Sequence, residues 1–306
     1  MNSKRWTPLL ILVLALGACA TQFSVPPVTG SANGEHLPGK IIWHDLLTDT
    51  PVRTQVFYSE LFGWEFRALP DKNINYMMIY HNGEMIGGMV DQNRLPNKED
   101  ISQWVVGLSV LDIEKAADVV REAGGTVFTP PTSLGDRGHI AVVADPQGAL
   151  LSLLQTRDGD PLDKQGPPAV GSFLWNELWA EDVASSATFY HRLSGYTIEE
   201  ETLGSEDSPV DYRILKTLDK PRAGIRSNPV GGLQPMWVSY LRVAGTNELE
   251  AILNNVEALG GQVLVPATER PGGGVVAIIA GPSGASIALQ TWDDDQTIGK
   301  LLEERQ

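Results

Sequence analysis

The sequence has few of the residues that form disulfide bonds and lacks a long apolar run that could form a transmembrane helix. Cys19 is the only cysteine among 306 residues, which excludes an internal disulfide and leaves the hydrophobic core to stabilise the fold. The apolar run at residues 9–16 is far shorter than the about 20 residues that a transmembrane helix needs. Basic residues are also scarce, with 23 Lys and Arg against 38 Asp and Glu and a net charge of −15. This charge argues against nucleic acid as a partner.

The N-terminus has the order of a secretory signal. Lys4 and Arg5 precede the apolar run, and Leu16-Gly17-Ala18 leads into Cys19, which predicts a signal peptide at residues 1–18. The block resembles the lipobox of bacterial lipoproteins. That resemblance implies lipidation of Cys19, anchoring to a membrane and a place in the cell envelope. An ordinary cleaved signal with a chance cysteine is the alternative.

The residues that follow Cys19 indicate which membrane would hold the protein and whether the segment before the first domain is flexible. Ala20 stands where an Asp would favour the inner membrane of a Gram-negative cell, so the resemblance implies the outer membrane if the source is Gram-negative. Residues 20–39 are rich in Pro, Gly, Ser, Thr and Asn and show no apolar periodicity. They predict a flexible tether, which with the lipidated cysteine spans residues 19–39.

The rest of the chain repeats itself. Motifs of the first half recur in the second half in the same order, and their spacings differ by only a few residues. The repeat predicts domains at 40–157 and 170–294, a linker at 158–169 and a polar C-terminal tail at 295–306. The matching segments are 43–46 and 175–178, 57–58 and 189–190, 61–64 and 193–196, Tyr76 and Tyr212, 104–105 and 237–238, 124–127 and 260–263, and 145–149 and 281–285.

Each domain contains a half-repeat of its own. A strand at 41–47 precedes a helix at 51–62 that stops at Gly63, and strands follow through Phe66, 76–80 and 85–90. A strand at 105–110, a helix at 113–122 closed by Gly124 and Gly125, and three strands ending at 150–154 repeat the pattern. The unit is βαβββ, four times over, which predicts an α+β fold.

This arrangement resembles the vicinal oxygen chelate superfamily, which includes glyoxalase I, bleomycin resistance proteins and extradiol dioxygenases. The resemblance rests on segments 57–64 and 189–196, on the Gly-Gly helix stops, and on the turn from Asp145 to Gly148. It implies that two modules pair into a curved eight-stranded sheet around a cup. The chain is thus expected to form two tandem glyoxalase/bleomycin-resistance-like domains with two cups.

Metal enzymes of this superfamily hold one divalent ion per cup on oxygen or nitrogen ligands. Transferring their ligand positions to this sequence gives residues that ligate metals poorly or not at all, and no acid stands in segments 85–90 or 222–227. We therefore predict no metal and no cofactor. A register shift of one residue would make His44 a ligand, so a divalent metal is the alternative. The transferred positions are Trp43 and Trp175, Val105 and Val238, and Ser152 and Ala288.

Strand alternation predicts which side chains line the cups. With Trp43 inside, Asp45 and Leu47 also point inward and His44 points outward; Asn176 likewise points outward in the second domain. Apolar walls with a few polar groups are typical of small-molecule sites. Asp45 and Glu177 are candidate acid/base residues, because burial beside Trp raises a carboxyl pKa. Alternatively, the indoles fill the barrels and the carboxylates bond backbone amides. The predicted ligand-binding residues are Trp43, Trp175, Trp179, Tyr212 and Gln290.

Four functions follow from these expectations, in order of preference. The first is an envelope-anchored module that binds a small organic ligand in a metal-free cup. The others are a metal-free enzyme using Asp45 or Glu177, an interaction protein with filled cups, and a metal-dependent lyase, isomerase or dioxygenase. The second cup is predicted to bind better, because Trp179 and Gln290 replace Leu47 and Leu154 there.

Overall fold

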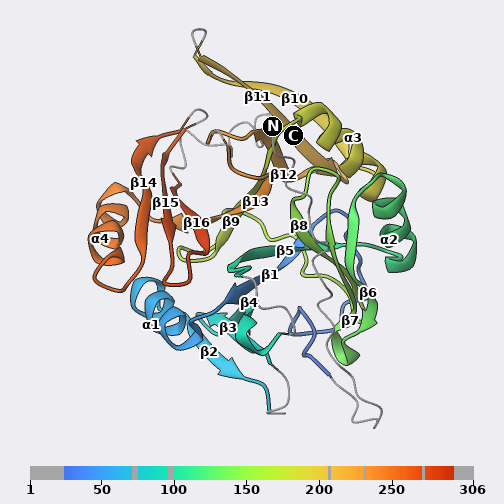
Figure 1. Ribbon diagram of the computed structural model, residues 1–306, viewed down its shortest axis with the longest axis horizontal. Coiled ribbons are helices and arrows are strands. Elements are labelled where there is room, and N and C mark those ends of the chain that lie inside the picture. The colour runs from blue at the N-terminus through green and yellow to red at the C-terminus, as the bar shows by residue number, and fades with distance from the viewer. Residues whose placement is uncertain are drawn as a thin grey trace, which may run out of the picture.

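The computed structural model describes residues 24–70, 75–95, 100–205, 208–230, 232–270 and 273–292. The predicted signal peptide, Cys19 and the predicted tail at 295–306 lie outside these residues. Two eight-stranded sheets form the body, with strand orders β2-β3-β4-β1-β5-β8-β7-β6 and β10-β11-β12-β9-β13-β16-β15-β14 (Figure 1). The predicted α+β fold with four βαβββ modules in two tandem domains is confirmed.

The two sheets are built from equivalent strands. Each is formed by two consecutive modules whose first strands pair antiparallel, so each cup lies within one domain rather than between domains. The first sheet contains β1 (Ile41–Thr48), β2 (Glu65–Ala68), β3 (Met77–His81), β4 (Glu84–Asp91), β5 (Gln103–Ser109), β6 (Thr126–Ser133), β7 (Gly138–Ala144) and β8 (Leu150–Thr156). The second contains β9 (Phe173–Ala180), β10 (Thr197–Ser205), β11 (Ser208–Thr217), β12 (Lys220–Ser227), β13 (Met236–Val243), β14 (Gln262–Glu269), β15 (Val275–Ala280) and β16 (Ser286–Thr291).

Local signals set the helix ends. The helices are α1 (Pro51–Phe62), α2 (Ile113–Glu122), α3 (Val183–Ser194) and α4 (Thr246–Val256). Asp112 and Asp182 cap α2 and α3 by accepting from backbone N–H groups in the first turn. Gly63 and Gly195 end α1 and α3 with φ of 68° and 70°, a left-handed conformation that glycine adopts at little cost. None of the helices in the described part of the chain is long and apolar enough to cross a bilayer.

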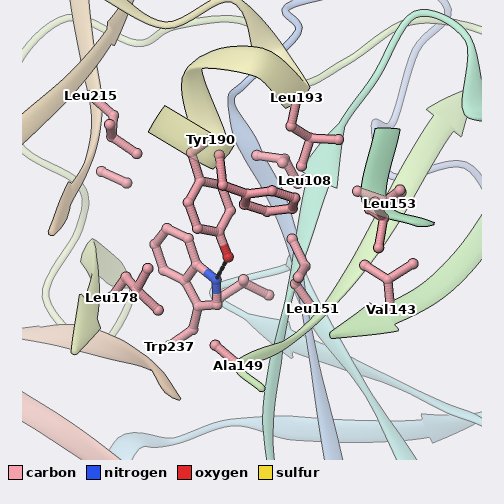
Figure 2. Close-up of a cluster of buried hydrophobic side chains, with 14 of the residues drawn as sticks. Leu108, Val143, Ala149, Leu151, Leu153, Leu178, Tyr190, Leu193, Leu215 and Trp237 are labelled. Carbon is pink, nitrogen blue, oxygen red and sulfur yellow. Dashed lines mark hydrogen bonds between the residues drawn. The ribbon is translucent and has the colours of Figure 1, made fainter. Parts of the chain in front are cut away.

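The two domains pack through their outer faces. α1 and α4 lie side by side on one flank, and α2 and α3 on the other (Figure 1). Each flank buries a core that mixes residues of both domains. In one of them Trp237 of β13 donates to the Tyr190 hydroxyl at 2.9 Å (Figure 2). Trp104 donates to Tyr58 in the same way at 3.0 Å, which explains why both residue pairs recur in the repeat.

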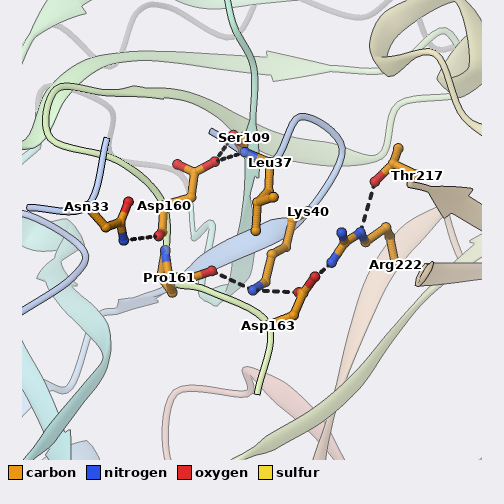
Figure 3. A network of polar contacts seen from close by, with 9 residues as sticks. All are labelled: Asn33, Leu37, Lys40, Ser109, Asp160, Pro161, Asp163, Thr217 and Arg222. Atoms are coloured by element: carbon orange, nitrogen blue, oxygen red, sulfur yellow. Dashed lines mark hydrogen bonds and ion pairs between the residues drawn. The ribbon is translucent and has the colours of Figure 1, made fainter. Parts of the chain in front are cut away.

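The linker after β8 forms hydrogen bonds and an ion pair with both domains and with the N-terminal region (Figure 3). The fully buried Asp160 accepts from the Leu37 amide at 2.7 Å and from the Ser109 hydroxyl at 2.5 Å. Asp163 pairs with Arg222 of β12 at 2.6 Å. Because these contacts join segments far apart in sequence, they fix the position of the second domain relative to the first.

Residues 24–39 lack regular secondary structure, as expected of a tether, but they pack against the first domain. Val25 and Val28 are 2% and 4% exposed. The Val25 amide donates to the Leu134 carbonyl at 3.0 Å, and the Asn33 amide to Asp158 at 3.0 Å. The prediction of flexibility therefore does not hold for this part, because two buried valines and backbone hydrogen bonds hold it in place.

Candidate binding cups

Strand alternation places the predicted residues as expected. β1 carries Trp43 and Asp45 on its concave face and His44 on the opposite face, and β9 repeats this with Glu177 and Asn176. His44 Nε2 hydrogen bonds Asn176 Oδ1 at 3.0 Å between the sheets. Burial lowers the pKa of His44 to about 4. His44 thus points toward the contact between the two sheets rather than into the cup.

In the first cup the carboxylate belongs to a short polar chain. Tyr76 Oη donates to Asp45 Oδ1 at 2.5 Å, and Trp43 Nε1 lies 3.0 Å from the same oxygen. Arg137 Nη1 donates to Tyr76 Oη at 2.9 Å, and its guanidinium lies 4.2 Å from the centre of the Trp43 ring. Burial raises the pKa of Asp45, and the charge of Arg137, which bonds Tyr76 rather than Asp45, offsets this only in part.

The chain's own N-terminal segment covers the first cup. Val25 and Val28 pack in one apolar cluster with Trp43 and other inward-facing side chains of this sheet. Arg137 Nε donates to the Pro26 carbonyl at 2.9 Å. The buried arginine of this cup is therefore tied to the N-terminal segment, while Asp45 and Tyr76 remain half-buried.

The second cup holds a buried ion pair. Glu177 is fully buried, and its carboxylate pairs with the guanidinium of Arg270. Tyr212 Oη donates to Glu177 Oε1 at 2.7 Å, and Tyr240 Oη donates to Oε2 at 2.6 Å. Trp179 Nε1 lies 3.4 Å from Oε2. The carboxylate is thus surrounded by donors, as a buried charge must be.

The two cup carboxylates differ in their pKa. Burial raises the pKa of Glu177, but the adjacent Arg270 charge and the two tyrosine hydroxyls outweigh it, and the net pKa lies below the usual range. The expectation of a raised carboxyl pKa agrees with Asp45 and is wrong for Glu177. The physical reason is direct contact with an arginine.

Most of the predicted ligand-binding residues are buried. Trp175 alone among them keeps a half-buried ring, and it donates to Tyr212 Oη at 2.9 Å. Gln290 is not free to meet a ligand through its Oε1, because that atom accepts from Arg270. Half-buried apolar side chains accompany Trp175 on the concave face, namely Met236, Val276 and Ile278. The accessible lining of this cup is therefore apolar with an aromatic centre.

At four equivalent positions of the sheet the second cup has the larger or more polar side chain, and two of these changes add an aromatic ring. The opposite holds where Ala288 replaces Ser152. The register of the strands gives the pairs, first cup before second, as Leu47 and Trp179, Val90 and Arg226, Gly107 and Tyr240, and Leu154 and Gln290.

The donor set of the cups does not fit a divalent metal. Within the described residues no three His, Cys, Asp or Glu side chains come together. Gly88 and Gly224 face Asp45 and Glu177 on the neighbouring strands, and a Cβ there would lie about 2 Å from a tyrosine hydroxyl. The space beside each carboxylate is thus filled by a tyrosine. In the second cup the guanidinium of Arg270 already neutralises the carboxylate.

Sequence reasoning missed the arginines. Arg137 lies in the loop at 135–138, and Arg270 directly follows β14 at the corresponding place in the second domain. Both are buried. The signal was present, because each domain has an arginine in a glycine-containing loop between its sixth and seventh strands. Tyr240 and Arg226 were also missed, since their counterparts Gly107 and Val90 gave no hint of polar function.

Known proteins that are similar in sequence to this chain belong to families consistent with this fold. The family model described as Glyoxalase/Bleomycin resistance protein/Dioxygenase superfamily matches residues 41–153. A protein named "Putative glyoxylase CFP32" from Mycobacterium tuberculosis is 28% identical over 259 residues, which cover 83% of this chain and 95% of that protein. "Anthracycline biosynthesis protein DauV" from Streptomyces sp. is 25% identical over 270 residues, covering 82% and 93%.

Solved structures share the architecture at low sequence identity. The Mn(II)-bound glyoxalase from Novosphingobium aromaticivorans superposes with a TM-score of 0.56 at 12% identity, covering 86% of this chain and 84% of that one. The 2,2',3-trihydroxybiphenyl 1,2-dioxygenase from Sphingomonas wittichii has a TM-score of 0.56 at 15% identity, covering 84% and 91%. These similarities concern the fold.

Proposed function

Since the chain belongs to the glyoxalase/bleomycin resistance/dioxygenase superfamily, we propose that it binds a small organic ligand in its second cup without a metal ion. One observation carries this proposal. The second cup keeps a half-buried aromatic and apolar lining around Trp175, above a fully hydrogen-bonded ion pair of Glu177 and Arg270. Apolar walls over a few fixed polar groups are the usual chemistry of small-molecule sites.

The ligand is proposed to be planar and aromatic. An indole ring offers a large flat surface for stacking at small entropic cost. Relatives named for anthracycline biosynthesis agree with such a ligand, since anthracyclines are planar polycycles. The first cup takes a structural role in this proposal, because Val25 and Val28 occupy it.

The proposal excludes acid–base chemistry at Glu177. A carboxylate whose pKa is lowered by Arg270 stays ionised near neutral pH and cannot donate a proton. Each of its oxygens already accepts hydrogen bonds, so it is also a weak base. Asp45 has a raised pKa, but it lies in the cup that the N-terminal segment covers.

Attachment to the cell envelope through Cys19 is part of the proposal. The lipobox-like block ends five residues before Ser24, where the described chain begins. Five extended residues reach at most about 18 Å. A lipid on Cys19 would therefore hold the rim of the first cup close to the membrane, and the second domain would carry the ligand.

The binding proposal is tested with N-phenyl-1-naphthylamine, an uncharged aromatic probe that fluoresces in apolar surroundings. Trp175→Leu should raise its dissociation constant about thirtyfold or more, as loss of an aromatic anchor does. Trp43→Leu makes the same change at the equivalent position of the first cup and should leave binding within twofold. The proposal fails if the folded protein does not bind the probe, or if Trp43→Leu has the larger effect.

A further inference from the structure

Residues 24–28, here called the strap, lie over the first cup without joining its sheet. Val25 and Val28 bury their side chains in the apolar cluster of the cup. The backbone amide of Val25 donates to the loop that precedes β7, and the Asp136 amide donates to the Ser24 hydroxyl at 3.0 Å. The strap is thus an occupant of the cup, held there by side-chain burial and a few hydrogen bonds.

A short exposed stretch connects the strap to the rest of the chain. Gly30, Ser31 and Ala32 are all exposed. The firmly attached part begins at Asn33, whose side chain donates to the Asp160 carbonyl at 2.8 Å. Rotation about residues 30–32 would therefore lift the strap from the cup and leave the contacts of Asn33 in place.

The Pro26 carbonyl of the strap supplies an acceptor that a side chain supplies in the second cup. There Arg270 bonds the side chain of Gln290, whereas the first cup has Leu154 at the equivalent position. Arg137 Nε donates to the Pro26 carbonyl at 2.9 Å instead. A backbone oxygen of the strap thus takes the place of a side-chain acceptor beside this buried arginine.

The charges around this oxygen favour an uncharged acceptor. Arg137 Nη1 donates to Tyr76 Oη at 2.9 Å, and Tyr76 Oη donates to Asp45 Oδ1 at 2.5 Å. Arg137 and Asp45 therefore balance part of each other's charge across the phenol. A carbonyl oxygen leaves this balance intact, while an anion would add a surplus negative charge near Asp45.

From these contacts we propose that the first cup is a second ligand site and that the strap is its built-in competitor. The ligand is an uncharged apolar compound with a carbonyl oxygen. Its oxygen replaces that of Pro26 on Arg137, and its apolar body replaces Val25 and Val28. Because strap and ligand need the same space, each weakens binding of the other by the same factor. The inference concerns the first cup and is independent of the ligand proposed for the second.

Competition between ligand and strap is measured in the wild-type chain. The probe is 6-propionyl-2-(dimethylamino)naphthalene, an uncharged aromatic ketone, and N-phenyl-1-naphthylamine, which lacks a carbonyl, is the comparison. Limited proteolysis within residues 24–39 should accelerate as the ketone concentration rises, because a displaced strap is open to the protease. The probe without a carbonyl should accelerate it clearly less.

Substitutions separate the strap from the arginine, in Trp175→Leu protein so that the second cup contributes little. Val25→Ser with Val28→Ser weakens the strap without adding a charge that would pair with Arg137, and should tighten ketone binding about tenfold. Adding Arg137→Met should reverse this gain, as loss of a hydrogen bond to a charged group costs about tenfold or more. It should leave the other probe within about twofold. Arg121→Met, at an exposed position on α2, is the matched control.

Each outcome decides about the first cup. Proteolysis that does not respond to the ketone, or ketone affinity that does not rise when the strap is weakened, overturns the inference and leaves the second-cup proposal standing. Equal weakening of both probes by Arg137→Met overturns the assigned ligand class. Circular dichroism establishes that each variant is folded, and if Arg137→Met unfolds, the response of wild-type proteolysis to the two probes decides the ligand class.

Discussion

His44 and Asn176 occupy the same position in the two repeats, and they hydrogen bond each other at 3.0 Å where the two sheets meet. The ring of His44 also stacks on Phe173, with centroids 3.6 Å apart. Asn176 Oδ1 accepts a second hydrogen bond from Ser239 at 2.9 Å. Residues that point away from their cups thus serve the contact between domains.

This contact predicts a pH dependence of stability. Burial lowers the pKa of His44 to about 4, against about 6.5 in an unfolded chain. Between these values the unfolded state binds the proton and the folded state does not, so stability falls as the pH falls from about 6.5 to 4. The loss from this group approaches about 3 kcal/mol.

Urea unfolding between pH 7.5 and 4.5 measures the effect. His44→Gln keeps a hydrogen-bonding side chain but cannot titrate, so its free energy of unfolding should depend less steeply on pH than that of the wild type. His139→Gln removes an exposed histidine and should follow the wild-type curve. Identical slopes for His44→Gln and the wild type would contradict the assignment.

The Glu177–Arg270 pair makes a second prediction. Glu177→Gln leaves the guanidinium of Arg270 buried without its counter-charge, and breaking a buried pair in this way costs about 3–5 kcal/mol. Asp45→Asn in the first cup should cost less, because Arg137 bonds Tyr76 and Pro26 rather than Asp45. Chemical denaturation of both variants tests the order, and an equal or larger loss for Asp45→Asn would refute it.

A feature of this site could be predicted from the sequence only where the residues that form it lie close together along the chain. Alternation along one strand is a local property, so the inward placement of Trp43 and Asp45 follows from sequence. The ends of α1 and α3 follow from Gly63 and Gly195. Arg270 reaches Glu177 across 93 residues of sequence, and no local pattern records such a contact.

The N-terminal segment was missed for a related reason. Val25 and Val28 lie in a stretch whose composition is typical of a flexible tether, and they have no periodicity to reveal a buried face. Their burial depends on a surface that only the folded first domain provides. Two apolar residues in a polar segment were the only available signal.

The N-terminal segment gives a third prediction. Val25→Asp with Val28→Asp places charges in an apolar cluster and should release residues 24–28 from the first cup. Limited proteolysis within residues 24–39 should accelerate, and binding of the neutral aromatic probe should rise from one to two molecules per chain. Ala32→Asp, at an exposed position, serves as the control. Unchanged proteolysis and stoichiometry would show that the segment does not close the cup.

A fourth prediction concerns metals. The tyrosine hydroxyls beside Asp45 and Glu177 occupy the space that a ligand side chain on the neighbouring strand would need. Elemental analysis of protein purified without chelators should therefore find well below one equivalent of Mn, Fe, Ni or Zn per chain. One equivalent per chain that is lost in Glu177→Gln would contradict this prediction and favour a metal enzyme.

The last prediction concerns Cys19. If the lipobox-like block directs lipidation, Cys19→Ser abolishes the only thiol that could carry the acyl chains, and the protein should move from the membrane fraction to the soluble envelope fraction. One acyl chain gives only weak, reversible membrane binding, whereas several anchor a protein stably. Ala20→Ser is the control and should remain in the membrane fraction. If Cys19→Ser stays with the membranes through detergent-free washing, attachment does not depend on this cysteine. The acidic surface, with a net charge of −15, makes electrostatic adhesion to anionic lipid a poor alternative, so retention would point to a protein partner in the envelope.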